Sequence, residues 1–480
     1  MAQRTTPNRE PARKQALELV KNCYRLLVDQ KGHAFIQVNP NQSRAVQIKS
    51  EECSAWVFKS VYEKLGIPLS AQDLKDVTDN LASLAKYNGD KTHTAWRIFK
   101  GDNSTYVDLG DGKIACITDQ GCTITTIAEG IHFIESAQKL PLPSPVMYEE
   151  LNLLRSYFNL ANDNQWYLLL SSIIGLFMGL PSRPIITFTG SEGCAKSTQS
   201  SLIQKIVDPN PVIRQLPPEK VEDLIISSLN STVFVIDNVG QLNKRVMNAL
   251  CALSTGLEYK KRQFYTEFGT VSQIIDSTLI INGINPEFIK QSDLASRVVW
   301  FPLPTISPES RVVESDYWTK FEADKPKILG SLYNILSKVL KVYDEVEFTP
   351  VSRLSDFCQV GNALESILEW PQGAFDTAML TMQSDLKLIS LDSDALGRAL
   401  LALMKKQECW EGSSSALLDK LCAHSSPKQH NSDSWPSSAM SLGRKLRALE
   451  PALNSQGISI NFRKSNDRLI TLSKVNHSQK

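Results

Sequence analysis

The stretch from Ile185 to Thr198 reads IITFTGSEGCAKST, and it decides the fold of the middle of the chain. Its apolar and β-branched start predicts a buried strand. The glycine-containing run after it predicts a loop whose backbone N–H groups turn inward. A helix is expected from Thr198 to about Ile206, so the loop would join a strand to a helix. This arrangement predicts a phosphate-binding loop.

Residues of this loop have expected roles. Lys196 would reach the β- and γ-phosphates of ATP, and the Ser197 hydroxyl would be a ligand of Mg²⁺. The usual pattern has Gly before the lysine, whereas this chain has Ala195, whose methyl group many loop backbones accept. A simple strand–turn–helix is the alternative. The residues expected to bind the nucleotide are Gly190, Ser191, Glu192, Gly193, Cys194, Ala195, Lys196, Ser197 and Thr198.

The composition is that of a globular protein with several domains. The chain has 480 residues and a net charge of +1, which predicts neither a polyanion binder nor an acidic scaffold as a whole. Its nine cysteines form no CxxC pair, and the N-terminus has no apolar signal core. The longest apolar run, Tyr167–Leu180, is too short to span a membrane. We therefore expect a cytoplasmic protein with reduced thiols and no membrane contact.

Two further apolar stretches end in polar residues. Residues 231–238 read STVFVIDN, so Asp237 would end a strand and could hold Mg²⁺ together with Ser197. Residues 277–283 read STLIING and place Asn282 at the end of another strand. A strand that ends at a polar turn would give the same pattern in either case. The segment SDLASR, which ends in Arg297, comes just before a further apolar strand.

In order and spacing, the segments GSEGCAKST, VFVIDN, LSTGLEYKKRQFYTE, STLIINGI and SDLASR resemble the AAA+/superfamily 3-like helicase ATPases of phages, plasmids and genomic islands. The resemblance covers residues 185–305. It implies an α/β P-loop NTPase core that hydrolyses ATP with Mg²⁺ in a homo-oligomer, expected to be a hexameric ring. It also implies that Asn282 orients the attacking water and that Arg297 acts on a neighbouring subunit's nucleotide. The implied catalytic set is Lys196, Asp237, Asn282 and Arg297.

One departure from the family pattern concerns the general base. Asn238 follows Asp237 where many AAA+ proteins have a glutamate. Water activation would then come from elsewhere, with Glu192 and Glu258 as candidates, or hydrolysis would be slow. Arg353, at the start of an expected lid helix, is a candidate second sensor or a surface residue.

The segment 259–275 lies between Asp237 and Asn282 and reads as two strands that turn at Phe268. Such an insertion resembles the pore hairpin of hexameric helicases. Its expected DNA contacts are Lys260, Lys261, Arg262 and Phe268. A contact between subunits is the alternative role for this hairpin.

The segments on either side of the core predict further domains. Residues 1–138 indicate an N-terminal α+β domain with a first helix over 10–29, and 139–147 a Pro-rich linker. The ATPase core is expected over 148–305, a helical lid over 306–405, and a last domain over 406–480. Asp108 and Asp111 could form a primase-type carboxylate pair, although an Asp-Gly turn accounts for Asp111.

The C-terminal segment is basic. Residues 411–480 contain ten Lys and Arg against five Asp and Glu, a net charge of +5. Two helices followed by a hairpin predict a winged-helix domain. A docking domain with a basic surface is the alternative. The expected DNA contacts are Arg444, Lys445 and Arg447 on the second helix, and Arg463, Lys464 and Arg468 on the hairpin.

Together these features predict an ATP-dependent DNA helicase or translocase that acts in the replication of a mobile element or phage, with a separate primase as a further partner. A nucleotide-gated replication initiator with little hydrolysis is the alternative, and Asn238 is compatible with it. A small-molecule phosphotransferase would need an acceptor-binding lid, and both the hairpin and the C-terminal domain argue against that class.

Overall fold

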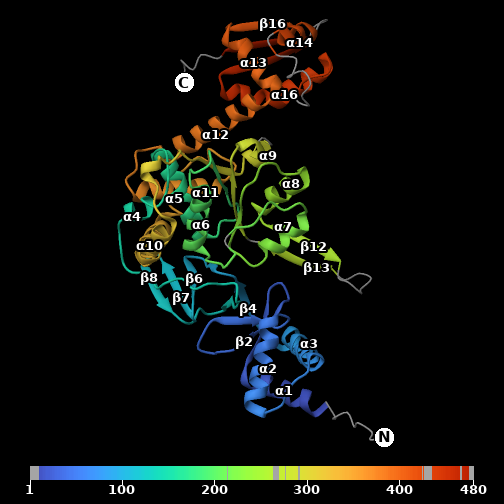
Figure 1. Cartoon of the computed structure of the whole chain (residues 1–480), viewed down its shortest axis with the longest axis vertical. Helices are drawn as coiled ribbons and strands as arrows, with labels where there is room; N and C mark the ends of the chain where they lie inside the picture. Colours follow the sequence, from blue (N-terminus) through green and yellow to red (C-terminus); the bar gives the residue numbers. More distant parts are fainter. Residues whose placement is uncertain are drawn as a thin grey trace.

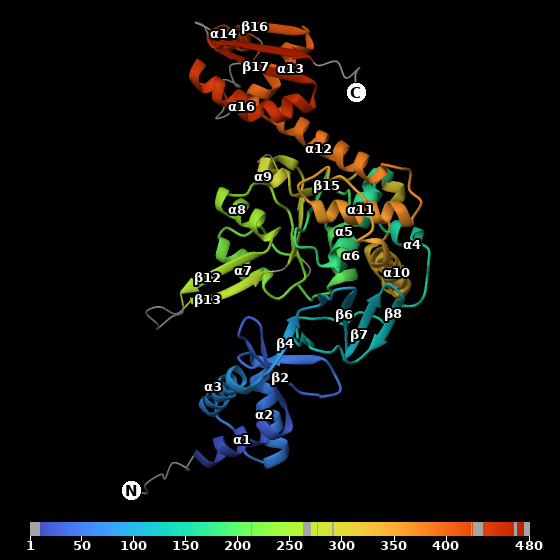
Figure 2. The same cartoon turned by 180° about the vertical axis from the view of Figure 1, so that it is seen from behind.

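The computed structural model describes residues 10–474 except 213, 263–269, 276, 290–291, 424, 426–434 and 465–467. The molecule is elongated, with an N-terminal unit at one end, a large central body, and a C-terminal unit joined to the body by a long helix (Figures 1 and 2). Among the described residues, no helix has the length and apolar character needed to cross a membrane.

The N-terminal unit is a small closed barrel with three helices. The barrel strands follow one another in the order β1 (Arg25–Asp29), β2 (Ala34–Gln37), β3 (Arg44–Gln47), β9 (Ile131–Ile134) and β4 (Asp90–Ala95). The helices are α1 (Glu10–Cys23), α2 (Glu51–Leu65) and α3 (Ala71–Asn88). Ser50 and Ser70 cap α2 and α3, and Gly66 ends α2 in a left-handed conformation.

The prediction of a single helix over 10–29 is wrong after residue 23. Helix α1 ends at Cys23, and Arg25–Asp29 forms strand β1. In this strand Leu27 and Asp29 are buried while their neighbours are partly exposed, which is the alternation of a strand. Pairing with β2 on one side and β4 on the other stabilises the extended conformation.

A second sheet lies within the predicted N-terminal domain but packs elsewhere. Its antiparallel strands are β5 (Ile98–Lys100), β6 (Ser104–Gly110), β7 (Lys113–Thr118) and β8 (Gly121–Thr125). Val107, Leu109, Ala115 and Ile117 from this sheet belong to the same hydrophobic core as the central body. The sheet is therefore part of the central body in packing, although it precedes residue 138 in sequence. Asp111 lies in the β6–β7 turn with a positive φ of 51°.

The Pro-rich segment expected to be a linker is bonded along its length. The Lys139 ammonium lies 2.6 Å from the Asp108 carboxylate, and both side chains are buried. Leu142 N–H donates to the Leu109 carbonyl. Val146 approaches helix α10 (Glu314–Val342) so closely at Gly330 that a Cβ there would lie 1.7 Å from the Val146 carbonyl oxygen. The segment thus holds the β5–β8 sheet and α10 together.

The central sheet consists of four strands in the order β11 (Val233–Ile236), β14 (Thr278–Gly283), β10 (Ile185–Thr189) and β15 (Val298–Pro302). All three strand pairs are parallel. Every residue of β10, β11 and β14 is buried, as expected for parallel strands covered on both faces. Strand β10, the strand predicted before the loop, lies inside the sheet.

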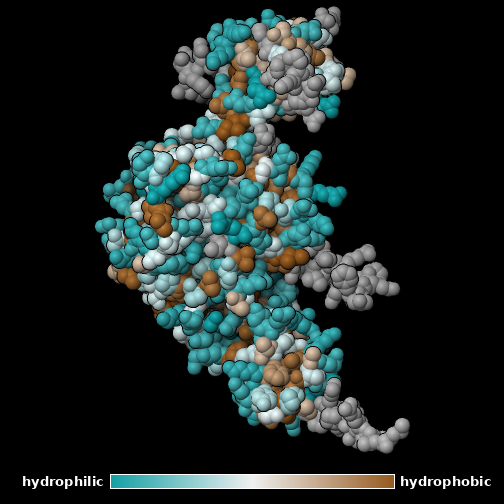
Figure 3. Space-filling view, in the orientation of Figure 1, coloured by the Kyte–Doolittle hydropathy of each residue, from teal (hydrophilic) through white to brown (hydrophobic). Residues whose placement is uncertain are grey.

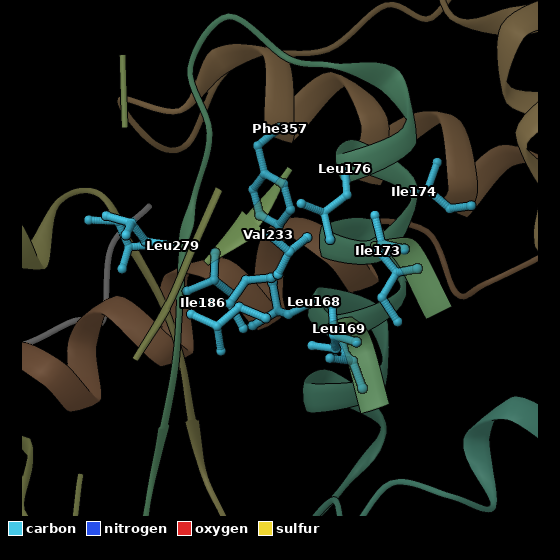
Figure 4. Packing of buried hydrophobic residues seen from close by; sticks show 14 of the residues in the cluster. Leu168, Leu169, Ile173, Ile174, Leu176, Ile186, Val233, Leu279 and Phe357 are labelled. Atoms are coloured by element: carbon cyan, nitrogen blue, oxygen red, sulfur yellow. The ribbon is translucent and has the colours of Figure 1, made fainter. Parts of the chain in front are cut away.

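Helices cover this sheet. They include α5 (Asp163–Met178), α6 (Lys196–Val207), α7 (Val221–Ser228), α8 (Lys244–Leu253) and α11 (Ser355–Ile367). Helix α5 is apolar on nearly all sides and buried along most of its length, because it packs between the sheet and α11. Figure 4 shows Leu168, Leu169 and Ile173 of α5 among side chains from β10, β11, β14 and α11.

The C-terminal unit begins earlier than the predicted boundary at 406. Helix α12 (Ala374–Ser393) leaves the central body, and α13 (Ala395–Lys405) packs in one core with α14 (Ser414–Ala423) and α16 (Ala439–Ser455). Strands β16 (Cys409–Ser413), β18 (Arg468–Lys474) and β17 (Ile458–Lys464) form a three-stranded sheet in that order. Figure 3 shows hydrophobic residues gathered at the neck formed by α12, where Leu380 is exposed.

A buried ion pair joins the β5–β8 sheet to the central sheet. Arg97 Nε donates to Asp208 Oδ1 at 3.0 Å, and the two side chains are 0% and 1% exposed. Other guanidinium N–H groups of Arg97 donate to the carbonyls of Asp108 and Leu140. Asp208 Oδ2 accepts from Thr232 N–H, just before β11. Because Asp208 follows α6, one carboxylate fixes the end of α6 and the start of β11.

Replacing Arg97 by Ala is expected to destabilise the protein by about 3–5 kcal/mol, because it leaves the Asp208 carboxylate buried without its partner. Arg25→Ala is the matched control, since it breaks an Arg–Asp pair whose side chains are 58% and 55% exposed and should cost about 0–1 kcal/mol. Urea unfolding followed by circular dichroism measures both. Equal losses in the two variants would contradict this account.

Candidate functional site

The candidate site is built around the glycine loop, residues 190–195, which joins β10 to α6. Gly190 has a φ of 151°, and a Cβ there would lie 2.7 Å from Cys194 Sγ and 2.9 Å from the Leu303 carbonyl oxygen, so glycine alone fits. Gly193 and Ala195 have φ values of 75° and 66°. These turns bring the chain from the strand directly into the first turn of α6.

The N-terminus of α6 can accept an anion. Ala195 is the N-cap residue and makes no side-chain hydrogen bond to the helix. The first N–H groups of a helix have no partner within the helix and carry a partial positive charge. Lys196 adds a full positive charge, and its ammonium donates to the carbonyls of Gly190 at 2.9 Å and Ser191 at 2.8 Å. The loop therefore combines backbone donors with a cation, which suits phosphate.

The predicted polar residues of three elements meet beside this loop. Asp237, directly after β11, accepts from Ser197 Oγ at 3.1 Å and from Asn282 Nδ2 at 3.0 Å. Asn282, in β14, is fully buried and also donates to Ser200 Oγ at 2.7 Å. Asn282 Oδ1 is buried without a hydrogen-bond partner among the described residues. The parallel pairing brings these three groups together, since the carboxyl ends of β11, β14 and β10 lie on the same side of the sheet.

Asn238 has the left-handed conformation, with a φ of 58°, and its N–H donates to Asp237 Oδ1 at 3.0 Å. Asn adopts this region more readily than most residues. Of the two glutamates considered as the base, Glu192 is exposed on the loop, and the side chain of Glu258 lies outside the described residues.

Arg297 lies on the opposite side of the sheet, at the amino ends of the parallel strands. It comes just before β15, and its carbonyl accepts from Ile185 N–H at the start of β10. Its guanidinium is largely buried, donates to Ser254 Oγ at 2.9 Å, and lies 3.6 Å from the Asp293 carboxylate. Arg353 lies on the same Asp293 at 2.7 Å and is half exposed. The structure thus separates both arginines from the glycine loop of the same chain.

Two arginines lie beside the loop in segments without a sequence motif, so the sequence alone does not predict their position. Arg214 lies in an irregular segment, and its Nη1 is 3.4 Å from Asp237 Oδ2. Arg311 follows the short helix η2 (Pro308–Ser310) and lies near Gly193. Neither belongs to a periodic element or a motif, so only tertiary structure identifies them.

The expected hairpin is present in the backbone. Strands β12 (Leu257–Arg262) and β13 (Thr270–Ile275) pair in antiparallel register and project from the body in both views (Figures 1 and 2). Lys260, Lys261 and Arg262 lie on β12, and their side chains are outside the described part of the chain. Phe268 also lies outside the described residues, so the DNA contacts of this hairpin stay a prediction.

The basic residues of the C-terminal unit lie on adjacent elements. Arg444 and Arg447 are exposed on α16, and the Arg447 guanidinium lies 4.8 Å from the centroid of the Phe462 ring on β17. Lys445 donates to the Trp435 carbonyl at 3.1 Å. Arg463 is exposed on β17. The side chains of Lys464 and Arg468 are outside the described part of the chain.

The chain matches two family models. Residues 151–378 match the actinomycete integrative conjugative element replication protein, and residues 396–480 match the RepA C-terminal domain of the same elements. The chain is also similar to the A form apo structure of the NrS-1 C-terminal region, with 12% identity, 96% of this chain and 98% of the other covered, and a TM-score of 0.44. A second apo structure of that region has 12% identity, coverages of 96% and 100%, and a TM-score of 0.42. No curated protein matches the chain.

Replacing Ala195 by Gly should stabilise the protein by about 0–1.5 kcal/mol, the difference between two opposing effects. An L-residue in the left-handed region costs about 1–2 kcal/mol, and glycine removes this strain while it loses about 0.5–1 kcal/mol to the unfolded chain's entropy. Ala448→Gly, at an exposed position inside α16, is the control and should destabilise by about 1 kcal/mol. Calorimetric unfolding measures both variants. A loss of stability in Ala195→Gly would contradict the claim that Ala195 is strained in its left-handed conformation.

Proposed function

Since the chain belongs to the replication proteins of actinomycete integrative conjugative elements, we propose that it is an ATP-dependent DNA helicase or translocase that acts in the replication of such an element. The proposal rests on the meeting of Ser197, Asp237 and Asn282 beside the glycine loop. These groups come from three elements and converge only because the strands are parallel.

The residues present fit ATP and Mg²⁺. The glycine loop, the first turn of α6 and Lys196 supply donors for the phosphates. Ser197 and Asp237 supply oxygen atoms, the ligands that Mg²⁺ prefers. Bound Mg²⁺ would neutralise phosphate charge during hydrolysis. The unpartnered Asn282 Oδ1 can accept a hydrogen bond from the attacking water and so orient it.

The strand order also supports an AAA+-like core. The sheet has the strand order β15–β10–β14–β11. Gln215 pairs with Ile236 of β11 in an isolated parallel bridge, so the chain at Gln215 occupies the place of a fifth strand beside β11. In the C-terminal unit, the succession α13, β16, α14, α16, β17, β18 supports a winged-helix domain, with α16 and the β17–β18 hairpin facing DNA.

A ring would place the nucleotide of one subunit against the far edge of its neighbour's sheet. Arg297 and Arg353 lie at that edge on a shared carboxylate, Asp293. For Arg297 to act in trans, its guanidinium has to leave Ser254 and Asp293, whereas Arg353 already reaches solvent. Arg297, the residue expected to act in trans, is therefore joined by Arg353 as a second candidate for that role, and a ring-shaped homo-oligomer is part of the proposal.

A nucleotide-gated initiator with little hydrolysis is the second candidate, because Asn238 offers no general base. It predicts that the protein binds ATP and assembles on DNA without turnover. A helicase predicts hydrolysis that DNA stimulates.

Steady-state ATP hydrolysis with and without single-stranded DNA tests the proposal. The wild type should hydrolyse ATP faster with DNA, Lys196→Ala should lose hydrolysis, and Arg297→Ala and Arg353→Ala should show which arginine the DNA-stimulated rate needs. Unfolding temperatures of all variants are measured alongside, since Arg297 is buried. Full hydrolysis in Lys196→Ala would contradict the site. ATP binding without hydrolysis in the wild type would support the initiator.

Replacing Arg444 and Arg463 together by Ala should weaken binding to DNA of any sequence. It should also reduce the slope of log affinity against log salt concentration by about two, which is about one for each lost phosphate contact. Both side chains are exposed, and neither carries the contact to Phe462 that Arg447 makes. Lys420→Ala, exposed on α14, is the control. Fluorescence anisotropy at several salt concentrations measures the slope. An unchanged slope would indicate that this face does not contact DNA.

A further inference from the structure

A segment that follows the central sheet runs along the glycine loop and is bonded to it at several points. We name residues 303–311 the strap. Leu303 N–H donates to the Thr189 carbonyl at 2.8 Å, and Thr305 Oγ1 lies 2.8 Å from Ser191 Oγ. Asn159 Nδ2 donates to the Pro304 carbonyl at 2.7 Å and to the Cys194 carbonyl at 3.1 Å. The strap therefore has a fixed position relative to the loop.

Arg311 ends the strap and places its guanidinium beside the loop. If Gly193 carried a Cβ, that atom would lie 3.4 Å from Arg311 Nη2 and 4.0 Å from Arg311 Cζ. The side chain is exposed, and no carboxylate among the described residues forms an ion pair with it. Arg353, in contrast, is paired with Asp293. Within the described part of the chain, Arg311 is thus a cation beside the loop without an ion-pair partner.

The surroundings of Arg311 at the glycine loop favour the binding of an anion. The backbone donors of the loop and the N-terminus of α6 already favour negative charge there, and Lys196 lies across the same loop. A guanidinium adds a planar fork of donors that matches two oxygen atoms of one phosphate. The absence of a side chain at Gly193 leaves room for the fork to reach over the loop.

We propose that Arg311 binds the phosphate chain of the nucleotide held by the glycine loop of its own subunit, as a contact separate from Lys196. The inference rests on the proposed function and deepens it. Only two residues lie between Arg311 and the start of α10 at Glu314, so phosphate binding would connect the ligand to the start of that helix. Arg311 then distinguishes nucleotides by the charge of their phosphate chain.

Displacement of a fluorescent ATP analogue by ATP and by ADP tests this inference in the full-length protein. Arg311→Ala should weaken ATP binding by about tenfold to a hundredfold, the range of a hydrogen-bonded charge contact, and Arg311→Lys should restore part of the loss. The affinity of Arg311→Ala should also depend less on salt, because one charge contact is missing. The unfolding temperature without nucleotide should not change, since Arg311 is exposed. Lys341→Ala, an exposed lysine in the last turn of α10, is the control.

The outcomes separate this inference from the proposed function. A loss for ATP alone places Arg311 on the γ-phosphate. An equal loss for both nucleotides would place it on the phosphates that they share and would contradict the discrimination by charge. Wild-type affinity in Arg311→Ala, with binding lost in Lys196→Ala, would overturn the Arg311 contact and leave the site intact. If the wild type itself does not bind ATP, the proposed function fails.

Discussion

The parallel pairing of β10 between β14 and β15 is the constraint on which the rest of the site depends. In a parallel sheet all carboxyl ends lie at one edge, so the loop after β10, Asp237 after β11 and Asn282 in β14 share that edge. The same rule sends Arg297, just before β15, to the other edge. The chain therefore has the glycine loop at one end of the parallel strands and Arg297 and Arg353 at the other. This is the polarity that the proposed head-to-tail assembly needs.

The buried ion pair adds a second constraint, because it links that sheet to the N-terminal half of the chain. Asp208 ends α6, whose first residue is Lys196, and its other oxygen holds Thr232 before β11, whose end carries Asp237. Both elements of the site are thus anchored at their far ends by one carboxylate. Arg97 balances this charge from the segment between β4 and β5. A change in the packing of the β5–β8 sheet would therefore shift the positions of both α6 and β11.

Local patterns in the sequence were sufficient for elements whose signal is local. Ser50 and Gly66 mark the ends of α2, and the apolar runs before Gly190 and Asp237 give β10 and β11. Packing is not local, so the attachment of β5–β8 to the central body and of α13 to the C-terminal unit could not be predicted from periodicity. Arg214 and Arg311 lie in irregular segments that only the fold brings to the loop. Strand β1 was missed because Leu26 and Val28 also fit a continued helix.

The two departures from the AAA+-like sequence pattern share one backbone property. Ala195 and Asn238 both have positive φ, and they flank the contact between Ser197 and Asp237. The left-handed region tolerates Asn better than a longer side chain such as Glu, so Asn238 matches the conformation that aims its N–H at Asp237. A glutamate at 238 would have to adopt this conformation or give up that hydrogen bond. The absence of a glutamate at 238 and the turn that fixes Asp237 are therefore consequences of the same residue, and the proposed hydrolysis would need another group to activate water.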